Sequence, residues 1–214
     1  MPGAVSPRIA RRRLSGARIG YSAGMPATQS DEILDALKEA AATLRDAKVL
    51  FALGGGLAAW ARGGPPTEHD IDFVIREADA DAALAALEEQ GMLVTRPPEG
   101  WLVKAWHGEV LIDMIFAPKG LEVDESFFDR CDELDVAAVR MPVMPLDDLI
   151  VGKLLALNEH SLDFGAPLEW ARSLREQIDW ADVAERTRES PFARTFLHLL
   201  HDLEVLDAST DRVA

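Results

Sequence analysis

Two aspartates separated by one apolar residue, Asp70-Ile71-Asp72, begin a short run of β-prone apolar residues at positions 73–75. Such a run favours a strand, in which alternate side chains lie on the same face. Asp70 and Asp72 therefore share one face of the predicted strand. Neighbouring carboxylates repel each other, and Mg²⁺, which prefers carboxylate and phosphate oxygens, would relieve that repulsion. The same pattern also occurs at strand ends and turns without a metal, so the pair alone leaves both interpretations open.

Three consecutive glycines, Gly54, Gly55 and Gly56, lie upstream of the aspartates and follow a short apolar segment at residues 49–53. The apolar segment predicts a buried strand, and the residues after the glycines predict a helix over 57–61. A turn made of glycine lets the backbone approach a ligand closely, because no side chain stands in the way. The sequence therefore places a glycine turn between a strand and a helix.

A third carboxylate, Asp113, lies inside an otherwise wholly apolar segment at residues 110–116. A charge in an apolar strand is unfavourable unless it is paired or binds a metal. A buried aspartate that meets an arginine or backbone donors is the alternative. Together with the Asp-x-Asp pair and the glycine turn, Asp113 favours a metal site.

The remaining pattern predicts an α+β chain. Helices are expected over 30–44 and 79–90, and the segments 101–106 and 110–116 predict a hairpin. Beyond residue 118 we expect one short strand at 139–144 and then helices, which begin near Pro145 and continue over 167–178, 180–188 and 191–206. The predicted organisation is a small mixed sheet flanked by helices over residues 28–118, followed by a mostly helical region over 119–214.

The first 27 residues differ from the rest, because they hold five arginines and no acidic residue. They are typical of a disordered tail, or of sequence upstream of a start at Met25; a nucleic-acid-binding arm is the alternative. The formal net charge of the chain is −15, so the other residues together carry about −20. That charge repels phosphate backbones, which makes a nucleic-acid partner unlikely unless this tail is engaged, and it suits a cationic small molecule.

Cysteine content and hydropathy point to a cytoplasmic location. The single cysteine, Cys131, excludes an internal disulfide and fits a reducing compartment. Its acidic neighbours disfavour the thiolate, so we interpret it as structural. No apolar run approaches the length of a membrane span, and no membrane association is expected.

The order of these motifs resembles the nucleotidyltransferase superfamily of DNA polymerase β type. Its pattern is an apolar residue with a glycine pair, then Asp-apolar-Asp, then a later aspartate on an adjacent strand. The matching segments here are Leu53-Gly54-Gly55-Gly56, Asp70-Ile71-Asp72 and Ile112-Asp113. The nearest likeness is to small bacterial aminoglycoside and lincosamide adenylyltransferases and to the AbiEii-like toxin branch.

The resemblance implies an enzyme that moves a nucleoside monophosphate from an NTP to an acceptor hydroxyl, with a small molecule as the expected acceptor. It implies that Asp70 and Asp72 bind two Mg²⁺ ions and that Asp113 completes the site of the ion that activates the acceptor. The backbone at Gly54, Gly55 and Gly56 would approach the triphosphate, and the pair Gly55-Gly56 fits the motif better than the pair before it.

The resemblance is weaker at the nucleotide phosphates and in the helical region. Relatives often carry an arginine four residues before the first aspartate, where this chain has Pro66. Arg62 is either a substitute phosphate contact or a surface charge. The toxin branch implies that Lys153 contacts the phosphates and that Asp179 stands near it. A lysine beside a leucine face and an acid on a solvated helix are the alternatives.

Two further functions stay open beside the leading one. A toxin-type nucleotidyltransferase would act on tRNA or protein and would have an antitoxin partner. A catalytically inactive, nucleotide-binding module would keep the fold without the reaction. The three retained aspartates, Asp70, Asp72 and Asp113, argue against an inactive module, because carboxylates that serve no function are unfavourable to keep.

Overall fold

A computed structural model of the chain describes residues 27–67 and 70–206. The predictions for the arginine-rich tail thus fall, but for its last residue, outside the described residues. Within this part, no helix combines the length and the apolar character that crossing a membrane requires.

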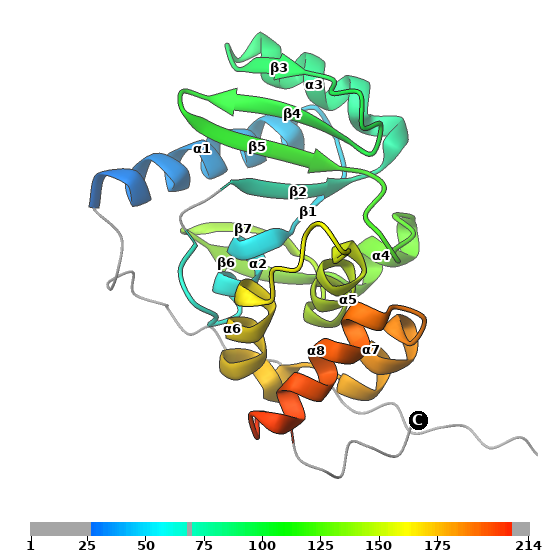
Figure 1. Ribbon diagram of the computed structural model, residues 1–214. Helices are drawn as coiled ribbons and strands as arrows, with labels where there is room; N and C mark the ends of the chain where they lie inside the picture. Colours follow the sequence, from blue (N-terminus) through cyan, green and yellow to red (C-terminus); the bar gives the residue numbers. More distant parts are fainter. Residues whose placement is uncertain (1–26, 68–69, 207–214) are drawn as a thin grey trace, which may run out of the picture.

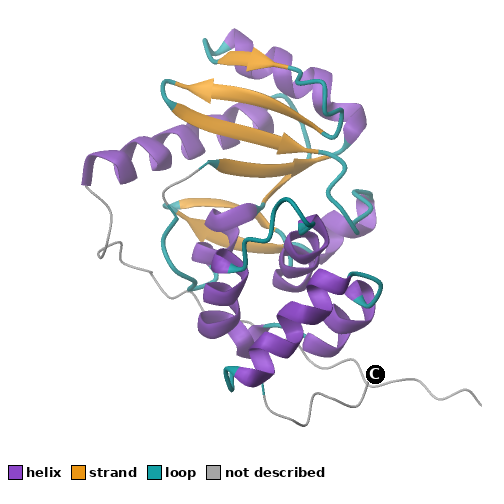
Figure 2. Cartoon of the chain, in the orientation of Figure 1, coloured by secondary structure: helices purple, strands orange, loops and turns teal. Residues whose placement is uncertain are grey.

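A seven-stranded mixed sheet forms the centre of the molecule, in the order β3-β4-β5-β2-β1-β7-β6 (Figure 2). Neighbouring strands are antiparallel, except that β2 pairs with β5 and β1 pairs with β7 in parallel. The strands are β1 Phe51–Leu53, β2 Ile71–Ile75, β3 Leu93–Thr95, β4 Leu102–His107, β5 Val110–Ile115, β6 Asp132–Val136 and β7 Val139–Val143.

Helices surround this sheet. They are α1 Ala27–Asp46, α2 Gly55–Ala61, α3 Ala80–Glu89, α4 Glu125–Arg130, α5 Leu146–Ala156, α6 Gly165–Leu174, α7 Trp180–Thr187 and α8 Pro191–Asp202, with short 3-10 helices η1 Glu77–Asp79 and η2 Arg175–Gln177. α1 and α3 pack against each other, whereas α5 to α8 form a separate group beyond β1, β7 and β6 (Figure 1). α5 contacts α2, which links this helical group to the glycine turn.

The central strands bury one continuous apolar face. Ile71, Phe73 and Ile75 of β2 are fully buried, as are Ile112 and Met114 of β5. An acid within so apolar a strand as β5 therefore stands out. Asp113 is 8% exposed and is one of the few buried charged residues of the described part.

The predicted α+β fold is confirmed, with differences at the edges of the sheet. β3, β6 and α4 were not predicted. β3 is an edge strand with mostly exposed side chains, and β6 is rich in acidic residues, so neither shows the apolar alternation of a half-buried strand. The expected strand at 139–144 is β7, and its pairing with β1 extends the sheet past residue 118. The last predicted helix, 191–206, ends earlier, at Asp202.

Candidate active site

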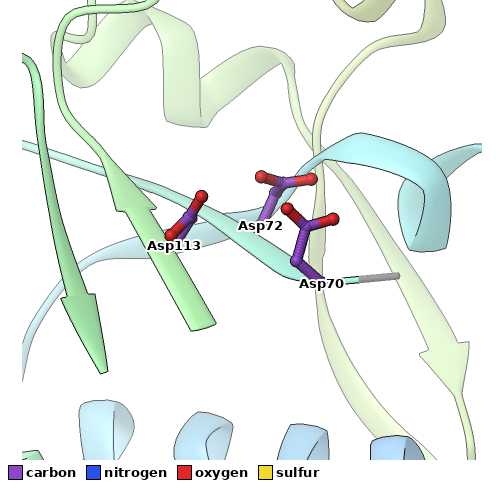
Figure 3. Close-up of side chains that lie close together, drawn as sticks. All are labelled: Asp70, Asp72 and Asp113. Atoms are coloured by element: carbon purple, nitrogen blue, oxygen red, sulfur yellow. The ribbon is translucent and has the colours of Figure 1, made fainter. Parts of the chain in front are cut away.

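Three carboxylates meet on two adjacent strands in the middle of the sheet. β2 and β5 run in parallel with Asp72 directly beside Asp113, and Asp70 lies just before β2. One ligand atom from each of the three side chains lies within 4.8 Å of the others. Figure 3 shows the three side chains on the same side of the strands, on the side opposite α1. The alternation of side chains along β2 explains why Asp70 and Asp72 share this face.

The glycine turn packs directly against the second of these acids. The Gly54 N–H donates to the Asp72 carbonyl at 2.7 Å. Gly55 has φ of +55°, and a Cβ there would lie 1.7 Å from Oδ2 of Asp72. A Cβ at Gly56 would lie 2.6 Å from Oγ1 of Thr67. The left-handed backbone and the lack of space both require glycine at position 55, so the turn and the carboxylate form one unit.

The pKa values of two of these acids reflect crowding of negative charge in a buried place. Burial, followed by the charges of Asp70 and Asp113, raises the pKa of Asp72 from 3.8 to about 7. Burial also raises the pKa of Asp113, although a hydrogen bond from Lys104 opposes that shift. A cation beside such a carboxylate would favour its ionised form and lower its pKa.

Lys104 is the functional neighbour that the sequence analysis missed. It lies on β4 directly opposite Asp113, and its Nζ donates to Oδ1 of Asp113 at 2.7 Å. The expected hairpin contained the signal. His107 pairs with Val110 next to the turn, so counting three residues away from the turn on each strand places Lys104 opposite Asp113. Pairing two charged positions across the predicted hairpin would have found this contact.

Lys153 comes from the helical group and lies near enough to the triad to act on Asp72. It lies in the last turn of α5 and is exposed. Its positive charge lowers the pKa of Asp72, so the two groups are within electrostatic reach. Within the described part of the chain, no side-chain hydrogen bond or ion pair engages Lys153, and its ammonium is free to contact a ligand.

Arg62 and Asp179 have structural partners. The Arg62 guanidinium donates to the carbonyls of Val143 and Met144 at 2.8–3.2 Å and pairs with Asp132 at 2.9 Å. These contacts connect the end of α2 to β6 and β7, and its side chain is only 10% exposed. Asp179 caps α7, where its side chain accepts hydrogen bonds from two backbone N–H groups. In the described part of the chain, neither side chain hydrogen-bonds or forms an ion pair with the triad, which is assembled without them.

The donor set of the triad fits a hard divalent cation. Three carboxylates offer oxygen atoms, which Mg²⁺ and Mn²⁺ prefer to nitrogen or sulfur. Among the described residues, these are also the three acidic side chains whose ligand atoms lie close enough to share an ion. Asp70, Asp72 and Asp113 would hold such an ion, with the glycine turn beside it.

Comparisons with known proteins agree with this arrangement. Residues 36–131 match the model of the aminoglycoside-2''-adenylyltransferase family, and this segment includes the glycine turn and all three carboxylates. The solution structure of the antibiotic-resistance factor ANT(2'')-Ia is 20% identical and covers 84% of this chain and 97% of its own, with a TM-score of 0.51. This chain has the fold and the motifs of the nucleotidyltransferase superfamily. The resemblance predicted from the sequence is thereby confirmed.

A second structure supports the same fold from a distant source. The antigenic nucleotidyltransferase-like protein of Paracoccidioides brasiliensis is 15% identical, with a TM-score of 0.52, and the match covers 85% of this chain and 93% of that protein. A comparison with curated protein sequences finds no match. At these identities the structural likeness establishes the fold, and the reaction has to be argued from the site.

Proposed function

We propose that this protein is a Mg²⁺-dependent nucleotidyltransferase that transfers a nucleoside monophosphate from an NTP to a hydroxyl of a small cationic acceptor. The observation that carries the proposal is the triad: three carboxylates from two adjacent strands share one face, and their ligand atoms lie within 4.8 Å of one another. Among the described residues, these are the three acidic side chains close enough to share one ion.

The aspartates, the glycine turn and Lys153 have different roles in the proposed reaction. Asp70 and Asp72 hold the cations, and Asp113 is placed to bind beside them and to orient the acceptor hydroxyl. Two Mg²⁺ ions, when bound, would stabilise the attacking and leaving oxygens of an in-line displacement. Gly55 and Gly56 keep side chains away from the space beside Asp72, so the triphosphate can approach the backbone there. Lys153 supplies a positive charge for the phosphates.

The net charge of the protein and its similarity to one enzyme family both favour a cationic acceptor. The residues after the arginine-rich tail carry a formal charge of about −20, which favours a cationic acceptor and disfavours a polyanion such as tRNA. The matching family model is that of aminoglycoside-2''-adenylyltransferases. Aminoglycosides are polyamines with many hydroxyl groups, so they satisfy both the charge of this protein and the chemistry of the triad. ATP is the expected donor.

The test is to incubate the full chain with each NTP, Mg²⁺ and a panel of aminoglycosides, and to measure diphosphate release and the mass of the acceptor. We expect one acceptor to gain the mass of a nucleoside monophosphate in stoichiometric proportion to the diphosphate. Asp72→Asn should lower the rate at least about a hundredfold. Asp135→Asn is the matched control, because Asp135 is an exposed acid on edge strand β6.

Two outcomes would contradict the proposal. One is diphosphate release that continues in Asp72→Asn at the rate of the control variant. The other is transfer to tRNA or protein with none to any small cation, which would support the toxin-type alternative.

A further inference from the structure

Lys104 is the one lysine of the described chain that forms an ion pair with a member of the triad. Its Nζ lies 2.7 Å from Oδ1 of Asp113, and the two side chains are 24% and 11% exposed. The register of β4 and β5 places the two residues directly opposite each other. A half-buried pair held by strand register is less screened by solvent than a surface pair, so Lys104 acts on the site more strongly than an exposed lysine would.

This pair makes the triad asymmetric. One oxygen of Asp113 is already occupied by an ammonium group. The carboxylates of Asp70 and Asp72, by contrast, have neither a hydrogen bond nor an ion pair to any side chain in residues 27–67 and 70–206. In the nucleotide-free protein, a cation can therefore bind the unpaired carboxylates of Asp70 and Asp72, whereas Lys104 on β4 already neutralises Asp113.

We propose that Lys104 is the resident counter-ion of the triad, a positioning residue that holds Asp113 in place and weakens divalent-cation binding in the absence of nucleotide. This inference rests on the proposed cation site. Asp70 and Asp72 hold the first cation, and binding that involves Asp113 is weaker because it occurs against the charge of Lys104. The repulsion between a lysine ammonium and a divalent ion a few ångströms away gives the direction of the effect.

The inference is tested by titrating the metal-free full chain with Mn²⁺ at pH 8 in the absence of nucleotide. The electron paramagnetic resonance signal of free Mn²⁺ measures how much of the ion is bound. Lys104→Met removes the charge and keeps the length of the side chain. We expect it to bind Mn²⁺ about tenfold more tightly than the unmodified protein. Lys104→Arg keeps the charge and should bind as the unmodified protein does. Lys38→Met removes an exposed lysine of α1, which is paired with Asp35, and should have no effect.

Lys104→Gln provides a second variant in case the methionine variant does not fold. Unchanged or weaker Mn²⁺ binding in whichever of these two variants folds overturns the inference, since weaker binding would mean that Lys104 assists the cation. Asp72→Asn separates this failure from failure of the proposed function. If Asp72→Asn binds Mn²⁺ as tightly as the unmodified protein, the triad is not the cation site, whatever Lys104 does.

Discussion

Two groups of charged residues, each built around buried or half-buried acids, differ in what neutralises those acids. Asp148 of α5 is 2% exposed and pairs with Arg130 of α4 at 2.9 Å and with Arg186 of α7 at 2.7 Å. Within the described residues, the triad has one ion pair, that between Asp113 and Lys104, and Asp72 has only the more distant charges of two lysines to lower its pKa. In the first group, two arginines of the protein neutralise the acid. In the second group, the acids outnumber the positive charges beside them.

The comparison shows that burial of an acid does not identify a functional site. Asp148 and its arginines connect α4, α5 and α7, so this group serves the fold, and it anchors the helix that carries Lys153. The triad is unfavourable for the fold, and the proposed cation would offset that cost. Shortage of counter-charge, together with a glycine turn that keeps side chains away, distinguishes the site from the structural network.

The largest effect on stability is expected at Asp148. Asp148→Ala removes the acid that neutralises two arginines at a buried position, and it should lower the free energy of unfolding by about 3 kcal/mol. Urea denaturation at pH 7.5 measures the change. Asp81→Ala is the control, because Asp81 is an exposed partner of Arg96 and such pairs contribute little. Equal stability of the two variants would contradict a structural role for the network.

Removing the charge of Asp72 is expected to raise the free energy of unfolding, whereas removing that of Asp148 lowers it. Its pKa is about 7 in the folded protein and near 3.8 when unfolded, so between these pH values the folded state holds an extra proton. Stability of the metal-free protein therefore falls as pH rises from about 4 to 7. Asp72→Asn removes this loss and should raise the free energy of unfolding at pH 8 by about 2 kcal/mol, with no gain at pH 4.

Urea denaturation in EDTA at both pH values measures this gain, with Asp135→Asn as the control. A variant that is less stable than the unmodified protein at pH 8 would show that the Asp72 carboxylate is satisfied within the fold. The two groups of acids would then not differ in the way proposed.

The smallest effect on stability is expected for alanine at Gly55, compared with alanine at Gly108, which has a similar left-handed backbone conformation. Gly55 and Gly108 have φ of +55° and +61°, but a Cβ at Gly108 meets nothing within 4 Å. Alanine in this region costs about 1 kcal/mol at either position. Gly55→Ala should cost roughly 1 kcal/mol more, because its Cβ displaces the Asp72 carboxylate, and it should also weaken Mn²⁺ binding. Thermal unfolding and Mn²⁺ titration of both variants measure the difference, and equal losses without weaker Mn²⁺ binding would contradict the close fit of turn and acid.

The sequence alone was sufficient for the parts of this site that depend on local pattern. Alternation along a strand placed Asp70 and Asp72 on one face, and an acid in an apolar run identified Asp113 as unusual. The superfamily motif then predicted that the two strands are neighbours, as β2 and β5 are. These inferences need only the periodicity of strands and the cost of burying charge.

The parts that depend on contacts distant in sequence were not predicted. Arg62 donates to the carbonyls of Val143, the last residue of β7, and of Met144, about eighty residues away, and no local pattern indicates these partners. Strand β6 is rich in acids, and it is in the sheet because β7 pairs with both β6 and β1. The resemblance implied only that Asp179 stands near Lys153, and the hydrogen bonds by which its side chain caps α7 are a separate, local feature.

The central claim, that the under-neutralised triad is the cation site, is tested most directly by anomalous X-ray scattering. Crystals of the protein would be grown with Mn²⁺ and a non-hydrolysable ATP analogue, and data would be collected at the manganese edge. The account predicts an anomalous peak in direct contact with Asp70 and Asp72 and beside Asp113. A triad without a peak, with manganese instead at the acids around Asp147 and Asp179, would contradict it.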